Sequence, residues 1–105
     1  MVLYVIKWNI SPEVTAEAYD AFTQRHIPAT VGGPGVVEFR GYRPVTGPHE
    51  VVVTYEFANL EDWAAWRQSD VMRAAEAELR KLGSGVTMEL WGHSEQVPEP
   101  VRPRG

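Results

Sequence analysis

The sequence contains no cysteine, which excludes disulfide bonds, thiolate metal sites and a cysteine nucleophile. A chain without cysteine fits a reducing compartment, so we expect it to act in the cytoplasm. An excess of basic residues is also missing, because the formal net charge is −4. That balance argues against a nucleic-acid partner, which is usually held through a basic stripe.

Long apolar runs are missing as well. No stretch approaches the length needed to span a membrane, so no membrane partner is expected. The first residues, Met1–Lys7, have neither the basic segment nor the long apolar segment of a signal peptide. With 44% hydrophobic and 23% charged residues, the 105-residue chain has the composition of one globular domain. We place that domain at residues 1–95 and a proline-rich tail at residues 96–105.

Hydrophobic periodicity and turn residues predict the order of the elements. A helix is expected to start at Ser11 or Thr15 and to kink or end at Pro28. Another is expected to start at Asn59, to break at Ser69-Asp70 and to run to Leu82. The expected strands cover Val2–Ile10, Val36–Arg43, Val51–Phe57 and Val86–His93. The order strand, helix, strand, strand, helix, strand predicts an α+β, ferredoxin-like fold: a four-stranded antiparallel sheet with two helices on one face.

Alternation along these strands separates an apolar face from a mixed one. The apolar face, which should lie under the helices, comprises Val37, Phe39, Val51, Val53, Tyr55, Phe57, Met88 and Leu90. The opposite face comprises Glu38, Arg40, Tyr42, Val52, Thr54, Glu56, Thr87, Glu89 and Trp91. Large aromatics on an uncovered sheet suggest pairing with another copy, so we predict a homodimer whose sheets face each other. Simple exposure to solvent is the alternative.

Trp63 and Trp66 are the most informative pair in the sequence. They lie three residues apart on one predicted helix, just before the break at Ser69-Asp70, and so neighbour each other. They suggest an aromatic wall of a small-molecule pocket, although filling the core is the commoner role of such residues.

Among the three histidines, His26 is the best candidate for acid–base chemistry. It lies with Tyr19 and Phe22 on the apolar stripe of the first helix, where a half-buried imidazole could exchange a proton near neutral pH. A core histidine with one backbone partner is the alternative. No histidines or acids show the spacing of metal ligands, so no metal site is predicted.

The chain resembles the antibiotic-biosynthesis monooxygenase family of the dimeric α/β-barrel superfamily, and in part its heme-degrading oxygenases. The resemblance rests on Asn9 near the end of the first strand, on residues 22–26 with the glycine-rich turn that follows, and on Trp66 with Ser69-Asp70-Val71. It covers roughly residues 2–93. One position departs from the heme degraders: Glu76 stands where they carry the histidine that binds iron, and a carboxylate is not a usual axial ligand.

The resemblance implies a small cofactor-independent monooxygenase, an oxidoreductase, that acts on an aromatic or polyketide-like molecule. In such enzymes the substrate itself reduces dioxygen, so no cofactor is expected. We expect Asn9, His26 and Trp66 to act in catalysis and four residues to bind the substrate: Tyr19, Phe22, Trp63 and Arg67. One alternative is a non-catalytic dimer that binds a small ligand, and another is a heme-binding or heme-degrading protein.

Overall fold

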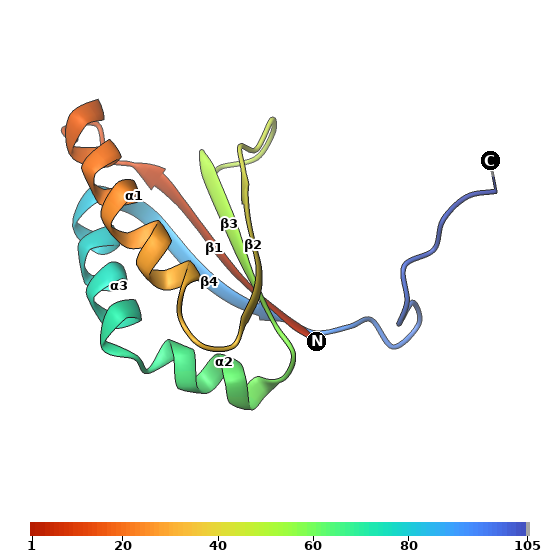
Figure 1. Ribbon diagram of the computed structural model, residues 1–105. Coiled ribbons are helices and arrows are strands. Elements are labelled where there is room, and N and C mark those ends of the chain that lie inside the picture. Colours follow the sequence, from red (N-terminus) through yellow and green to blue (C-terminus); the bar gives the residue numbers. More distant parts are fainter. Residues whose placement is uncertain (105) are drawn as a thin grey trace.

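The computed structural model describes residues 1–104 as a four-stranded sheet with three helices (Figure 1). Gly105, the last residue of the predicted tail, lies outside the described residues. The elements are β1 (Val2–Ile10), α1 (Ala16–Val31), β2 (Val36–Tyr42), β3 (Val51–Phe57), α2 (Leu60–Arg67), α3 (Asp70–Leu82) and β4 (Gly83–Trp91).

The sheet has the order β2-β3-β1-β4, and all its neighbouring strands are antiparallel. β1 is central: Tyr4 pairs with Tyr55 of β3 on one side and with Leu90 of β4 on the other. The helices α1 and α3 lie on the same side of the sheet, and α2 joins the end of β3 to α3 (Figure 1). The predicted ferredoxin-like arrangement is therefore confirmed.

Side-chain caps fix where each helix begins. Thr15, Asn59 and Ser69 accept hydrogen bonds from backbone N–H groups three residues further on, at 2.8–3.2 Å. The cap at Ser69 divides the second predicted helix into α2 and α3. Pro28 does not end α1, which continues to Val31. A proline in the last turn removes only one backbone donor, and the chain then leaves the helix at Gly32, whose N–H bonds Pro28 O at 3.0 Å.

Two strand predictions need correction. Val37 was expected under the helices, but its side chain is 55% exposed. A register shift between Val36 and Glu38 displaces it, so Val36 packs against the core in its place. β4 begins at Gly83 rather than Val86, because the segment after α3 enters the sheet directly and pairs with the end of β1. Gly85 adopts a φ of +60° there, which glycine tolerates readily.

The core lies between the sheet and the helices. Its main components are aromatic side chains of β1 and β3 together with Trp66 of α2 and two apolar residues of α3, Met72 and Leu79. Trp66 packs against three of these rings, those of Tyr4, Tyr55 and Phe57, with centroids 4.7–5.9 Å apart. This cluster links α2 to the two central strands.

Within residues 1–104, no helix covers the opposite face of the sheet (Figure 1). Tyr42 and Trp91 are 50% and 45% exposed there, whereas Val5 at the middle of the face is completely buried. Lys7 forms an ion pair with Glu89 at 3.3 Å, and Glu89 accepts a hydrogen bond from the indole of Trp91. These two interactions, that of Trp91 first, lower the pKa of Glu89.

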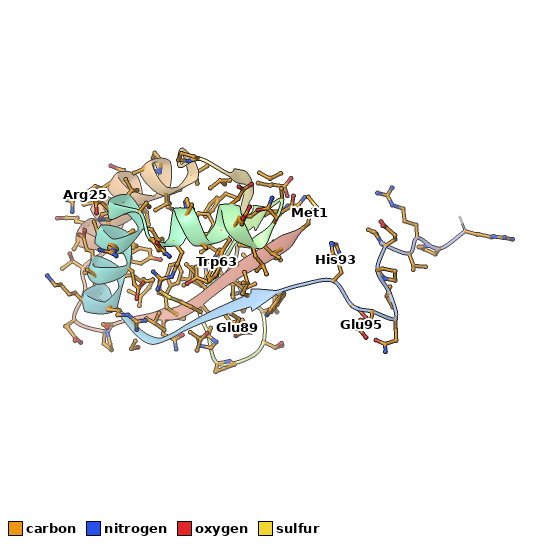
Figure 2. The ribbon with its side chains drawn as sticks, turned by 90° about the horizontal axis from the view of Figure 1, so that it is seen from below. Met1, Arg25, Trp63, Glu89, His93 and Glu95 are labelled. Carbon is orange, nitrogen blue, oxygen red and sulfur yellow. The ribbon has the colours of Figure 1, made fainter. Side chains whose placement is uncertain are left out.

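Beyond Trp91, residues 92–104 form no helix or strand. They lead away from the sheet, as the positions of His93 and Glu95 show (Figure 2). Within residues 1–104, none of the helices is both long and apolar enough to cross a lipid bilayer.

Candidate functional site

A cavity of about 80 Å³ lies between the sheet and the helices α1 and α3. β1, β2 and β3 form its floor, and the two helices form its walls. Apolar side chains dominate the lining. The polar ones are Tyr19, Thr23, His26, Thr30, Tyr55 and Glu76. The cavity is partly open to solvent, as a substrate site must be.

His26 is the imidazole in this lining, and a carboxylate of the neighbouring helix holds it. Its side chain is 11% exposed, and its Nε2 atom bonds Glu78 of α3. The Glu78 carboxylate also receives two hydrogen bonds from Arg25, at 2.9 and 3.1 Å. Because an ionised carboxylate only accepts, Nε2 must donate, and in the neutral ring Nδ1 is then the unprotonated atom. A lone pair on that atom is what a general base needs.

The pair with His26 affects Glu78 in turn. The hydrogen bond from His26, aided by the charge of Arg25, lowers the pKa of the Glu78 carboxyl. Glu78 therefore stays ionised at neutral pH and keeps the imidazole oriented. Glu78 was not predicted from the sequence, because a glutamate on a helix is normally exposed. Its position two residues after Glu76 gave no sign of the contact with α1.

Two tyrosine hydroxyls also reach the cavity. Tyr19 accepts a hydrogen bond from the indole of Trp8 at 3.2 Å, which leaves its own O–H available. Tyr55 bonds the hydroxyl of Thr30 at 2.9 Å, and Thr30 bonds backbone carbonyls of α1. Burial raises the pKa of both tyrosines, so both stay protonated at neutral pH. Because the Thr30 proton goes to backbone carbonyls, Tyr55 donates to Thr30 and can only accept from a ligand, whereas Tyr19 can donate to one.

The structure brings Tyr19, Phe22 and His26 together on the cavity wall. The rings of Phe22 and His26 lie 5.3 Å apart, and those of Tyr19 and Phe22 lie 6.0 Å apart. These residues follow one another at spacings of three and four on α1, so helical periodicity was sufficient to group them.

Neither tryptophan singled out in the sequence lines the cavity. Trp66 is 3% exposed, and its indole N–H bonds the backbone carbonyl of Thr30 at 2.9 Å. It ties α2 to the end of α1, which is the core-filling role that the sequence analysis left open. Trp63 lies between α2 and the sheet, with its ring 5.6 Å from that of Tyr4 (Figure 2). Its Nε1 is buried and has no partner among residues 1–104.

Asn9 also lies outside the cavity. Its side-chain amide donates to the carbonyl of Pro48 at 3.0 Å and accepts from the N–H of Glu50 at 2.8 Å. Glu50 in turn accepts from the N–H of Ile10 at 3.0 Å. Asn9 therefore holds the connection between β2 and β3 against the end of β1.

This role predicts the effect of Asn9→Ala. We expect the free energy of unfolding to fall by about 1–2 kcal/mol, because two hydrogen bonds of a partly exposed amide are lost. Urea unfolding would measure it, with Gln24→Ala on the exposed side of α1 as the control. An Asn9→Ala variant as stable as the control would show that the connection is held by other contacts.

Arg67 does not line the cavity, but its partner does. It bonds Glu76 at 2.5 Å, and Arg80 bonds the other oxygen of the same carboxylate at 3.1 Å. Glu76 and Arg80 have the helical spacing of four residues that brings such side chains together, whereas the contact with Arg67 depends on how α2 packs against α3. Glu76 thus joins the cavity to a pair of guanidinium groups.

The sequence pattern of the antibiotic biosynthesis monooxygenase family matches residues 1–78. The chain belongs to this family. The match agrees with the resemblance drawn from Asn9, Trp66 and Ser69-Asp70-Val71. No curated protein sequence matches the chain significantly.

Solved structures share the fold of this monooxygenase-family chain at low sequence identity. SnoaB, a cofactor-independent oxygenase from Streptomyces nogalater, has a TM-score of 0.71 and 14% identity, over 93% of this chain and 97% of that one. The hydroxynitrile lyase of Passiflora edulis has a TM-score of 0.77 and 11% identity, over 90% and 94%. A dimeric ferredoxin-like protein of unknown function from Thermobifida fusca has a TM-score of 0.73 and 11% identity, over 86% and 88%. The fold alone therefore carries different activities.

Proposed function

We propose that this chain is a cofactor-independent monooxygenase that oxidises a small aromatic molecule in the cavity between the sheet and α1 and α3. The observation that carries the proposal is the His26–Glu78 pair at the wall of an otherwise largely apolar cavity. Membership of the family and the similarity to SnoaB support the same reaction class. The lack of cysteine fits action in the cytoplasm.

The reaction needs little from the protein beyond a base and a dry site. His26 Nδ1 removes the phenolic proton of the substrate, and the resulting phenolate is electron-rich enough to reduce dioxygen. One oxygen atom ends on a ring carbon as a carbonyl group, and the other leaves as water. For a phenol with a free ring position, the overall balance is C₆H₅OH + O₂ → C₆H₄O₂ (a quinone) + H₂O. Apolar residues such as Phe22 shield the cavity side of the imidazole from bulk water, and the partly exposed Glu78 carboxylate orients the ring from the other side.

The size of the cavity restricts the substrate. A cavity of roughly 150 Å³ binds benzene, so the space of about 80 Å³ found here takes a single ring only if lining side chains move. A polycyclic polyketide would have to extend through the opening. We therefore expect the preferred substrate to contain a single substituted ring, which would stack near Phe22.

The protein is proposed to act as a homodimer. The uncovered sheet face carries two half-exposed aromatic rings, Tyr42 on β2 and Trp91 on β4, with the Lys7–Glu89 ion pair between β1 and β4. Such a face suits a second copy of the same chain. The dimeric relative from Thermobifida fusca supports this assembly.

The function is tested by oxygen uptake with single-ring phenols and hydroquinones. We expect saturable, protein-dependent consumption of one O₂ per product, above the autoxidation measured with heat-denatured protein. Product mass spectrometry under ¹⁸O₂ should find one labelled oxygen atom. A panel that binds, as seen by tryptophan fluorescence, but consumes no oxygen would replace this proposal with non-catalytic ligand binding.

Heme degradation receives no support from the site geometry. Glu76, at the position of the iron-binding histidine in heme degraders, has both carboxylate oxygens engaged by Arg67 and Arg80. The cavity is also far smaller than a heme.

A further inference from the structure

Two guanidinium groups converge on one sulfur atom at the edge of the sheet. The Nη2 atoms of Arg67 and Arg80 lie 3.9 and 4.0 Å from the Sδ atom of Met88 on β4. A thioether is only a weak acceptor, whereas a guanidinium carries five N–H donors that match the geometry of a carboxylate. Both arginines therefore face a point where a strong acceptor would suit them better than the sulfur does.

The charges and hydrogen bonds around this point are not balanced. Glu76 is the carboxylate that pairs with both arginines among residues 1–104, so the three side chains together carry a net charge of +1. Their side chains are 29%, 54% and 19% exposed for Arg67, Arg80 and Glu76, so a ligand has access. One turn before Arg67 on α2, the buried indole N–H of Trp63 also has no acceptor. Around the two guanidinium groups the acceptors are Glu76, the Met88 sulfur and the Tyr4 hydroxyl, which interacts with Arg67.

The cluster borders the cavity. Glu76 lines the cavity with one side and binds the arginines with its oxygens. Met88 pairs across the sheet with Ile6, which is part of the cavity floor. Glu76 is therefore a common boundary of the cavity and the arginine cluster.

We propose that Arg67 and Arg80 bind the carboxylate of an aromatic acid whose ring enters the cavity. This assignment rests on the proposed function for the identity of the cavity, and it adds a charged group to the substrate class. It also includes residues beyond the family match, because that match ends at residue 78. The bound carboxylate would bridge the two guanidinium groups beside Met88, with Glu76 as the one neighbouring negative charge.

Benzoate is the test ligand and benzamide its neutral counterpart of similar shape. The methyl group of Met88 reports on the site by ¹H–¹³C NMR, and the chain has only two other methionines to assign, Met1 and Met72. At constant ionic strength, benzoate should give a saturable shift of the Met88 signal and benzamide should not. Equal shifts with both ligands, or none with benzoate, would overturn the assignment.

Variants distinguish binding of benzoate by the two arginines from a purely structural role of their salt bridges. Arg67→Gln and Arg80→Gln should each weaken benzoate binding by about fivefold or more, because a partly exposed charge-assisted contact is lost. Arg73→Gln is the matched control, since Arg73 is an exposed arginine of α3 outside the cluster. Glu76→Gln should tighten binding, because the competing carboxylate loses its charge. Weaker binding in Glu76→Gln, or an equal loss in Arg73→Gln, would contradict the proposal.

A comparison of benzoate with acetate tests whether the aromatic ring of the ligand enters the cavity. Acetate should bind at least about tenfold more weakly than benzoate, because it buries no ring in the cavity. Equal affinities would show that the ring stays outside. Binding needs no turnover, so benzoate that binds without any oxygen consumption with the phenol panel would leave this inference standing while the proposed reaction fails.

Discussion

Replacing Trp66 with alanine should lower the free energy of unfolding by about 3–5 kcal/mol, the range for removing a large buried aromatic side chain. The ring packs on Tyr4, Tyr55 and Phe57, and its N–H satisfies the buried carbonyl of Thr30. Its removal leaves both a cavity in the core and an unpaired acceptor. Denaturant unfolding followed by circular dichroism would measure the loss.

Two further variants separate the packing of the ring from its hydrogen bond and provide an exposed control. Trp66→Phe keeps most of the packing and loses the hydrogen bond, so we expect an intermediate cost of about 1–3 kcal/mol. Leu60→Ala, at a 58% exposed position of the same helix, should change stability by no more than about 0.5 kcal/mol. If Trp66→Ala cost no more than Leu60→Ala, the aromatic cluster would not hold α2 in place.

Replacing His26 with glutamine should reduce kcat for oxygen uptake by at least about 100-fold, because the proposed general base is lost. Glutamine keeps a polar side chain that can still donate to Glu78, so the fold should survive. Glu78→Gln should reduce the rate less, since it removes the charge that orients the imidazole and stabilises it once protonated. Steady-state kinetics with the best phenol of the panel would measure both effects.

His93→Gln provides the matched control. His93 is exposed and follows the last strand, well away from α1 (Figure 2). The same chemical change there should leave kcat and KM as in the unsubstituted protein. If His26→Gln retained full activity with intact thermal unfolding, the base would have to be another group.

Local sequence signals were sufficient for the fold. The caps at Thr15, Asn59 and Ser69 bind the backbone as their residue types predict, and apolar alternation placed the strands. The errors occurred where the backbone departs from regular geometry. The register shift that exposes Val37 and the direct entry of Gly83 into β4 depend on pairing with distant strands, which no local pattern reports.

The candidate site was only partly predictable, for a related reason. Tyr19, Phe22 and His26 lie on one helix, so their spacing was enough to bring them together. Glu78 and Arg67 acquire their roles through contacts of α3 with α1 and α2, and these depend on how the helices pack. Asn9 and Trp66 mark the family well, yet their polar atoms are engaged by the backbone of Pro48, Glu50 and Thr30.

In the turn after α1, the backbone of Gly33 lies against the indole ring of Trp66, which couples the residues allowed at the two positions. A Cβ atom at position 33 would lie 2.8 Å from Cδ1 of Trp66 and 3.0 Å from its Nε1, closer than atoms tolerate. The two positions therefore cannot vary independently: a side chain at 33 becomes acceptable only where residue 66 is smaller. A mutagenesis library that randomises either site alone would return almost only the starting residue, whereas one that varies both together would open a different set of cores.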